Sequence, residues 1–342
     1  MTEQIPIQPT PVGALRFNTD NAKLEYFDGN QYVNITTDSP ERHTGGTRGL
    51  FVGGRNPANS DTIDFVSIDT TGNAVDFGNR LEAGRQGGAT GSRVRGVICG
   101  RPVPLHSNII EFLTFASTGN TQDFGDSTNV RAGAPMSISN GTRGVFAGGE
   151  IDSSGTVGNI IDYVTIAQTG NAVDFGDLNI PHSDGGRGQS PTRGVFSGGR
   201  GPDASTRTNA MEYITTATLG NTSDFGDLTT GRNEIGADSN AVRAIFAGGN
   251  TGSVINVIDF ITIATLANAQ DFGDLSSNST ETRGSASPTR FVISLGSTPG
   301  STQVNNIEYV QIMTTGNSID FGDLTETRKQ AAGVSNGHGG LG

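Results

Sequence analysis

The tripeptide Asp-Phe-Gly occurs six times, and its even spacing is the feature that most restricts the fold. The copies are 47 to 51 residues apart and begin at Asp76, Asp123, Asp174, Asp224, Asp271 and Asp320. A period of that length is typical of repeat proteins in which each small β-sheet buries its faces only against its neighbours. We therefore expect residues 47–342 to form one continuous array of six units.

Four segments recur in phase with the tripeptide, and each predicts one strand. An apolar run led by arginine ends in glycine, as in RGVFAGG from Arg143, and a β-branched run with an acidic residue follows it, as in IDYVTI from Ile161. Alternation and β-branching favour strands in both. The Asp-Phe-Gly segment is the next strand, and the Gly-Asn pair before it, such as Gly170-Asn171, predicts a tight hairpin turn. A stretch of small residues completes the unit.

Six units of four strands predict an all-β fold, a six-bladed β-propeller. We expect the small-residue stretch to be the inner strand, because little room is left for side chains near the axis. The chain then enters the first blade at its second strand near Thr47, and the segment 331–337 supplies the inner strand that closes the ring. Such closure leaves no open sheet edge.

These paired strand signatures resemble kelch repeats, which join an apolar strand ending in Gly-Gly to a strand carrying an acidic residue and Tyr or Phe. The resemblance implies four-stranded propeller blades. Kelch blades usually carry a Trp in the outer strand, and here the Phe of the tripeptide stands in its place. These residues are Phe77, Phe124, Phe175, Phe225, Phe272 and Phe321.

Residues 1–46 lie outside the repeat and predict a tether with a small β attachment segment. The Pro-rich IPIQPTPVG is expected to be extended. After it, ALRFN from Ala14, KLEYFDG from Lys23 and QYVNI from Gln31 alternate apolar and polar residues around turn signals, which predicts a hairpin or a three-stranded meander. So small a sheet is marginally stable alone, and we expect it to pack on the propeller or on another subunit.

The stretch GALRFNTDNAKLEYFDGNQYVNI resembles a segment of tail-fibre and other virion proteins of tailed bacteriophages. The repeats, with their DFGDL and TRGVFAGG motifs, are similar to those of structural proteins from phages of aquatic bacteria such as cyanobacteria. The resemblance implies a virion protein that is made in the host cytoplasm without a signal peptide, forms a homo-oligomer and docks to other virion proteins through its N-terminal segment. We expect a tail-fibre or adhesin-type propeller whose loops bind a host surface glycan, a receptor or neighbouring virion proteins. The alternative is a capsid decoration or tail-assembly scaffold that binds no receptor.

Composition argues against several kinds of partner. The formal charge is −12 and no basic stripe is present, so we expect no nucleic-acid partner. No apolar run approaches the length of a membrane span, and no signal peptide is visible. Cys99 is the single cysteine, which leaves no intrachain disulfide or paired-cysteine zinc site, and we expect it to be buried.

No catalytic motif accompanies the repeats, so we expect neither an enzyme nor a cofactor nor a metal. A kinase would need an HRD loop and a strand lysine besides Asp-Phe-Gly, and a copper oxidase would need a cluster of Tyr, His and Cys ligands. The loop DSSGTVGN from Asp152 has alternating oxygen side chains, yet it lacks the glycine and terminal glutamate of an EF-hand. The histidines fall in different phases of the repeat: His43, His106, His182 and His338.

The remaining recurrent residues predict structural contacts. The Asp of each tripeptide is expected to accept turn or backbone hydrogen bonds, and the Phe to pack between blades. We expect one arginine per repeat to pair with one carboxylate per repeat, the alternative being a ring that captures an anion. The arginines are Arg48, Arg95, Arg143, Arg193, Arg243 and Arg290, and the carboxylates are Asp64, Glu111, Asp162, Glu212, Asp259 and Glu308.

The loops between the second and third strands vary in length and sequence, while the strands stay nearly constant. We therefore expect these loops to recognise the binding partner. They span residues 55–62, 101–108, 150–159, 200–209, 250–256 and 297–306. The candidate recognition residues are Arg55, Asn59, His106, Asp152, Asp203, Asn250 and Ser301.

Overall fold

The computed structural model describes residues 10–18, 23–34, 46–101, 107–131, 133–152, 154–203 and 205–342, and the chain divides into two compact units, residues 1–43 and 44–342. Across these described ranges the secondary structure consists of β-strands and one 3-10 turn, η2 (Gly339–Leu341), without an α-helix. The prediction of an all-β fold is confirmed.

The first unit contains one antiparallel three-stranded meander, with Phe17 paired opposite Leu24. Because successive side chains of a strand point to opposite faces, these two apolar residues share a face, and Phe17 is 62% exposed. On the other face Arg16 lies over the ring of Tyr32 and forms an ion pair with Glu25 at 2.8 Å. The strands are β1 (Leu15–Asn18), β2 (Lys23–Phe27) and β3 (Tyr32–Asn34).

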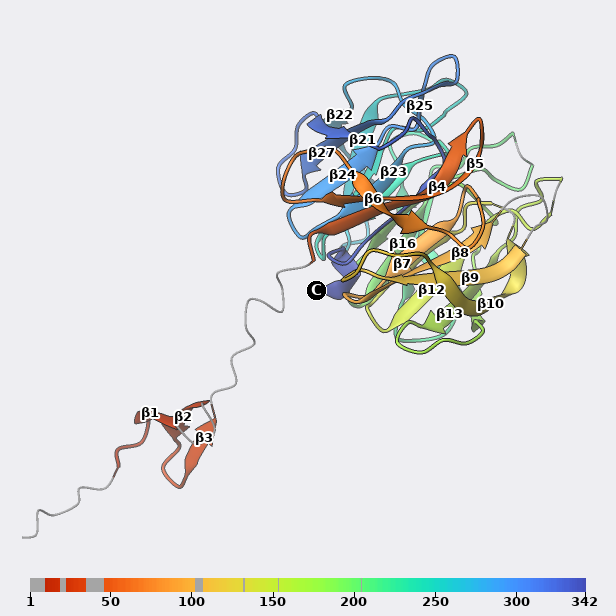
Figure 1. The fold of residues 1–342 in the computed structure, drawn as a ribbon. Coiled ribbons are helices and arrows are strands. Elements are labelled where there is room, and N and C mark those ends of the chain that lie inside the picture. The colour runs from red at the N-terminus through yellow and green to blue at the C-terminus, as the bar shows by residue number, and fades with distance from the viewer. Residues whose placement is uncertain are drawn as a thin grey trace, which may run out of the picture. The chain divides into compact units, whose positions relative to one another are not determined.

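In the described part of the second unit, the strands form six four-stranded antiparallel sheets (Figure 1). Below, the strands of each sheet are named in hydrogen-bonded order and called its first, second, third and fourth strands. The sheets are numbered in the order in which their second strands occur in the sequence. The first sheet is β29 (Ala332–Ser335), β4 (Arg48–Asn56), β5 (Ala58–Ser67) and β6 (Val75–Asn79). The second is β7 (Gly88–Gly91), β8 (Arg95–Arg101), β9 (Ser107–Thr114) and β10 (Gln122–Arg131). The third is β11 (Met136–Ser139), β12 (Arg143–Ala147), β13 (Ile160–Thr165) and β14 (Val173–Asp177).

The other three sheets repeat the same order of strands. The fourth is β15 (Gly186–Gln189), β16 (Arg193–Ser197), β17 (Ala210–Thr215) and β18 (Ser223–Asp227). The fifth is β19 (Gly236–Ser239), β20 (Arg243–Ala247), β21 (Val257–Thr262) and β22 (Gln270–Asp274). The sixth is β23 (Arg283–Ala286), β24 (Arg290–Ser294), β27 (Asn306–Gln311) and β28 (Ile319–Asp323), with a small hairpin of β25 (Ser297–Thr298) and β26 (Thr302–Gln303) between its second and third strands.

The first strands of the six sheets contact one another in cyclic order: β7, β11, β15, β19, β23, β29 and again β7. Small residues are frequent in these strands because neighbouring backbones approach closely. A Cβ on Gly333 of β29, for example, would lie 2.0 Å from the carbonyl oxygen of Gly284 in β23. The cycle closes through β29, which comes from the C-terminal end of the unit and pairs with β4, Ala332 opposite Val52.

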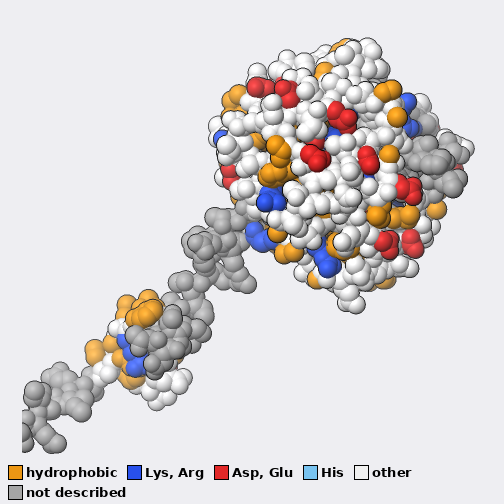
Figure 2. Space-filling model, viewed as in Figure 1, with side chains coloured by type: hydrophobic (Ala, Val, Ile, Leu, Met, Phe, Trp, Pro, Cys, Tyr) orange, Lys and Arg blue, Asp and Glu red, His pale blue; other side chains and the backbone are white. Residues whose placement is uncertain are grey.

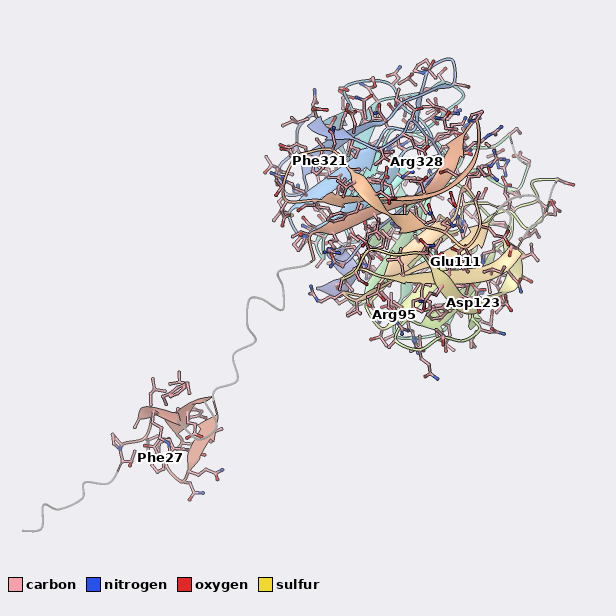
Figure 3. All side chains as sticks on the ribbon, in the orientation of Figure 1. Phe27, Arg95, Glu111, Asp123, Phe321 and Arg328 are labelled. Atoms are coloured by element: carbon pink, nitrogen blue, oxygen red, sulfur yellow. The ribbon has the colours of Figure 1, made fainter. Side chains whose placement is uncertain are left out.

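Aromatic pairs fill the space inside the sheets. The Phe of each tripeptide is 2% exposed, and in five sheets it meets an aromatic ring of the third strand edge-on, with centroids 5.8 to 6.2 Å apart. Phe321, which Figure 3 labels, packs against Tyr309. Such edge-to-face pairs stabilise the fold beyond the contribution of the apolar surface that they bury.

The Gly-Asn pairs do not form the tight hairpin turns that the sequence predicted. The turn after the third strand comes earlier, where the Thr314 N–H donates to the Gln311 carbonyl, and Gly316 and Asn317 follow as an extended connection. This connection forms hydrogen bonds with the fourth strand of the preceding sheet, β22. The Gly316 N–H donates to the Phe272 carbonyl, and Asn317 Oδ1 accepts from the Asp274 N–H. A Gly-Asn signal near a strand therefore marks an inter-sheet contact in this protein.

Each tripeptide glycine is required by this contact. Gly273 has φ +148°, and a Cβ there would lie 2.5 Å from the backbone of Gly316. Gly316 has a similar φ, +154°, but no atom within 4 Å of where its Cβ would stand. The two positions separate the effect of backbone strain from that of inter-sheet packing.

We expect Gly273→Ala to lower the free energy of unfolding by about 2–4 kcal/mol, and the matched variant Gly316→Ala by about 1 kcal/mol. Both carry the strain of an L-residue at positive φ, but only the first also separates two backbones. Urea denaturation followed by circular dichroism measures the difference. Equal losses would show that the contact between sheets adds nothing.

Candidate functional site

The arginine that opens each second strand does not pair with the repeated carboxylate, so that expectation is wrong. Arg243, for example, lies with its guanidinium 4.4 Å from the centroid of the Phe260 ring and donates to the carbonyl of Ile312 in the next sheet. The same two contacts recur for all six arginines of this set, between the sixth and first sheets as well. These side chains are engaged in joining sheets.

A second set of arginines pairs with the carboxylates, again from one sheet to the next. Their side chains are at most 1% exposed, so both charges are removed from water. Figure 3 labels Arg328 and Glu111 of this set. The pairs are Arg80–Glu111 at 3.0 Å, Arg131–Asp162 at 2.7 Å, Arg232–Asp259 at 3.0 Å and Arg328–Asp64 at 3.1 Å. Three of these arginines recur at one position of the repeat, eight residues after the tripeptide aspartate, and that recurrence could have predicted them: Arg131, Arg232 and Arg328.

Glu212 and Glu308 belong to the same set of carboxylates but receive hydrogen bonds instead of an arginine. Glu212 accepts from the N–H groups of Asn179 and Ile180 and from the Thr222 hydroxyl. His182 stands at the position where three of the other repeats carry arginine. Its ring is fully buried, both ring nitrogens lack a hydrogen-bond partner among the described residues, and burial lowers its pKa to about 4.

We expect Arg232→Leu to lower the free energy of unfolding by about 3–5 kcal/mol, because it leaves the carboxylate of Asp259 buried without its cation. The double variant Arg232→Leu, Asp259→Leu should recover most of that loss, since neither charge is then buried. Thermal and urea unfolding of the three chains measure it. A double variant as unstable as the single one would contradict this account.

The candidate recognition loops share one end of the sheets with the connections that lead into the first strands. In five of the six loops the leading residue forms an isolated β-bridge with such a connection, as Arg55 does with Lys329 and Asn250 with Asn233. The first loop is shorter than expected, because β4 and β5 continue until Asn56 lies opposite Ala58. We call this end of the sheets the loop face.

The loop tips are held by local hydrogen bonds. Asp152 accepts from the N–H groups of Ser154 and Thr156, and Asp203 accepts from the N–H and hydroxyl of Thr206. These bonds lower the pKa of both exposed carboxyl groups. The carboxylate of Asp152 thus organises its own loop, and among the described residues no group of three His, Cys, Asp or Glu side chains could hold a metal ion.

The other candidate loop residues are placed as follows. Asn250 accepts from Gly252 N–H, Ser301 has φ +60° in the tip between β25 and β26, and Asn59 lies in β5 opposite Arg55. His106 lies outside the described residues, as does His43.

A ring of residues with positive φ surrounds the start of the first strands, and sequence reasoning missed it. Each member precedes its strand by two residues, and although none is glycine, φ lies between 32° and 60°. Backbone hydrogen bonds join four of the six neighbouring pairs in this ring, as where the Glu234 N–H donates to the Asp184 carbonyl. Such strained backbone is often found at binding sites. We call the set the axial ring: Gln86, Ala134, Asp184, Glu234, Glu281 and Gln330.

The side chains of the axial ring are polar at five positions, and several are buried. Glu281 accepts from Ser297 Oγ and Gln330 Nε2 and pairs with Lys329 at 2.8 Å. Burial raises the pKa of Asp184 to about 7, against the effect of Arg283, whose Nη2 lies 3.8 Å from Asp184 Oδ1.

Below the ring, the space between the first strands is a cavity of about 30 Å³. Arg187 and Arg283 line it together with glycines of several first strands. At the opposite end, the C-terminal residues close the ring: His338 Nε2 lies 3.0 Å from the Gly91 carbonyl oxygen, and a Cβ on Gly340 would lie 1.7 Å from the Ser139 carbonyl oxygen. Ala134 is the member of the axial ring that lines the cavity, and we call the end of the cavity beside it the mouth.

On the described surface seen in Figure 2, carboxylates are scattered and Lys and Arg side chains stand apart from one another. None of the described helical segments is long and apolar enough to cross a membrane. Comparison with known proteins identifies no matching family model and no matching curated protein. The site is therefore interpreted from its own geometry.

We expect the contribution of Asp184 to the stability of the chain to fall as pH rises from about 4 to about 7. Its folded pKa of about 7 lies above the value of about 3.9 for an exposed aspartate. The folded state therefore binds the proton more tightly, and its advantage is lost as pH rises through this window.

The variant Asp184→Asn should lack this contribution. Between pH 4 and pH 8, the change in its free energy of unfolding should therefore differ from that of the wild-type chain by an amount on the order of 2–4 kcal/mol. His182, with a lowered pKa, acts in the opposite direction but is common to both chains. Unfolding free energies from urea titrations across this pH range measure the effect. Parallel curves would show that Asp184 does not titrate in this window.

Proposed function

We propose that the six four-stranded sheets form a six-bladed, kelch-like β-propeller that works as a binding module of a virion and carries no catalysis of its own. The cyclic contacts of the first strands and the pairing of β29 with β4 support the propeller. The virion assignment rests on the resemblance of the N-terminal segment and the repeats to phage structural proteins.

The observation that carries the binding role is the grouping of all the variable features at one end of the sheets. The loops between second and third strands, the axial ring and the mouth of the cavity share the loop face, whereas strands and inter-sheet contacts repeat almost unchanged. Recognition commonly resides in variable loops on a rigid scaffold. We propose that this face binds a host surface glycan or receptor, as a tail-fibre or adhesin-type head does.

The N-terminal meander supports an attachment role for the first unit. A sheet of this size buries little of its own apolar surface, and Leu15 and Phe17 are more than 60% exposed. We propose that it docks to another virion protein or to further copies of this chain. A decoration or scaffold protein would use the same attachment but would have its loop face covered by neighbouring subunits.

The test combines localisation with binding. Mass spectrometry and electron microscopy of virions whose genome encodes the chain should find it there, with the loop face open to solvent. The labelled chain should bind host cells, and Asp152→Ala together with Asp203→Ala should weaken that binding about tenfold by releasing two loop tips.

The matched control is Asp76→Ala together with Asp123→Ala, which removes two exposed carboxylates from outer strands (Asp123 in Figure 3). Absence from the virion would overturn the virion assignment. A loop face covered by other virion subunits would overturn the adhesin in favour of the scaffold.

A further inference from the structure

Two arginines break the pattern of small residues in the first strands. Arg187 is the second residue of β15, and Arg283 is the first residue of β23. In the other sheets, each of these positions holds Gly, Ala, Ser or Met. The residues are Gly88, Met136, Gly186, Gly236 and Ala332 at the first position, and Ala89, Ser137, Ala237, Gly284 and Gly333 at the second. The repeated fold therefore does not account for the two charges, and departures of this kind are often found at functional sites.

Both arginines line the cavity between the first strands, and they are the only charged residues among the described residues that line it. All the others are glycines or apolar residues, with no carboxylate among them. Each of the two arginine side chains keeps 13% of its surface accessible. The wall of the cavity is therefore positively charged.

The nearest carboxylates leave N–H donors of both guanidinium groups unused. Asp238 Oδ2 lies 3.9 Å from Arg187 Nη2. Asp184 Oδ1 lies 3.8 Å from Arg283 Nη2, and both distances exceed that of a hydrogen bond. Arg187 Nη1 and Arg283 Nη2 donate no hydrogen bond to a described residue, and neither atom is fully buried. Both side chains thus have donors left for an acceptor in the cavity.

The two guanidinium charges also repel one another. Burial lowers the pKa of Arg187, the Asp238 carboxylate raises it, and the charge of Arg283 lowers it again. Asp238 is held by other donors, because its carboxylate accepts from Gln189 Nε2 and from the Ala286 N–H. An arginine keeps its proton in a protein, so the repulsion persists. An anion in the cavity would offset it, whereas a cation would add to it.

The size of the cavity limits which anion fits. Its volume of about 30 Å³ has room for about one or two water-sized particles. That excludes an organic acid and suits a single-atom anion. Guanidinium groups are more weakly hydrated than ammonium groups, so arginine is well suited to hold an anion out of water.

We propose that Arg187 and Arg283 bind one chloride ion in the cavity between the first strands. The two guanidinium groups donate charge-assisted hydrogen bonds to it from the fourth and sixth sheets, which are not neighbours in the cycle. The ion thus joins two first strands that have no direct contact of their own. This site does not depend on the proposed function, because it requires neither a virion nor a receptor.

Anomalous diffraction from crystals of the full chain soaked in sodium bromide locates the ion directly. We expect one bromide peak in the cavity of the wild-type chain, with Arg187 and Arg283 as its donors. Arg187→Ala and Arg283→Ala should each lack the peak. Both variants should still fold, because other sheets already carry alanine at these positions: Ala89, Ala237 and Ala332. The matched control Arg207→Ala removes a loop-face arginine that does not line the cavity, and should keep the peak.

Thermal unfolding of the same chains measures binding in solution. At constant ionic strength, replacing sodium gluconate with sodium chloride should raise the Tm of the wild-type chain and of Arg207→Ala by about 2 °C, once chloride exceeds its Kd about tenfold. The Tm of Arg187→Ala and Arg283→Ala should not respond.

A wild-type cavity without bromide overturns the inference, and this result needs no variant. A bromide peak without any chloride effect on the Tm shows an adventitious ion only and also overturns it. An equal chloride effect in all four chains places the anion elsewhere. None of these outcomes bears on binding to host cells, so the proposed function stands or fails separately.

Discussion

The contacts that pass from one sheet to the next are what the remainder of the structure depends on. A carboxylate of a third strand, such as Asp259, lies fully buried and finds its cation, Arg232, in the preceding sheet. In a sheet taken alone, each of these charged groups would lack its partner. The arginines that stack on one sheet and donate to the next would likewise lose one of their two contacts. Since these bonds run around the whole cycle, no sheet reaches its full stability without both neighbours.

The two ends of the cycle differ in what closes them. At one end the turn η2 and His338 fill the space between the first strands with close backbone contacts. At the loop face the same space is surrounded by the axial ring, where Asp184 keeps a raised pKa and an unfilled acceptor. A chain selected only for packing would be expected to place an apolar side chain there. The polar mouth is therefore the part of the molecule whose chemistry the fold itself does not explain.

Repetition made much of this architecture predictable. The four strands of each unit follow from their alternation and from the phase of the tripeptide, and the buried Phe follows from its position in the outer strand. Partners in other sheets could not be derived in the same way. Gly316-Asn317 has the local signature of a hairpin turn but contacts the preceding sheet, and Arg80 reaches its carboxylate from a backbone position that differs from that of Arg131. The axial ring escaped notice because its members share a backbone conformation rather than a residue type.

The position of β4 has a mechanical consequence. This strand begins at Arg48, close to where the second unit begins. It pairs with β5 along most of its length and with β29 from Gly49 to Val52. A pull applied through the N-terminal segment, while the loop face is held, acts along the strand. It would load the bonds of both ladders together instead of opening one pair at a time from a free edge. The order of strands that closes the cycle thus places the N-terminal end of the second unit on a strand with a partner on each side.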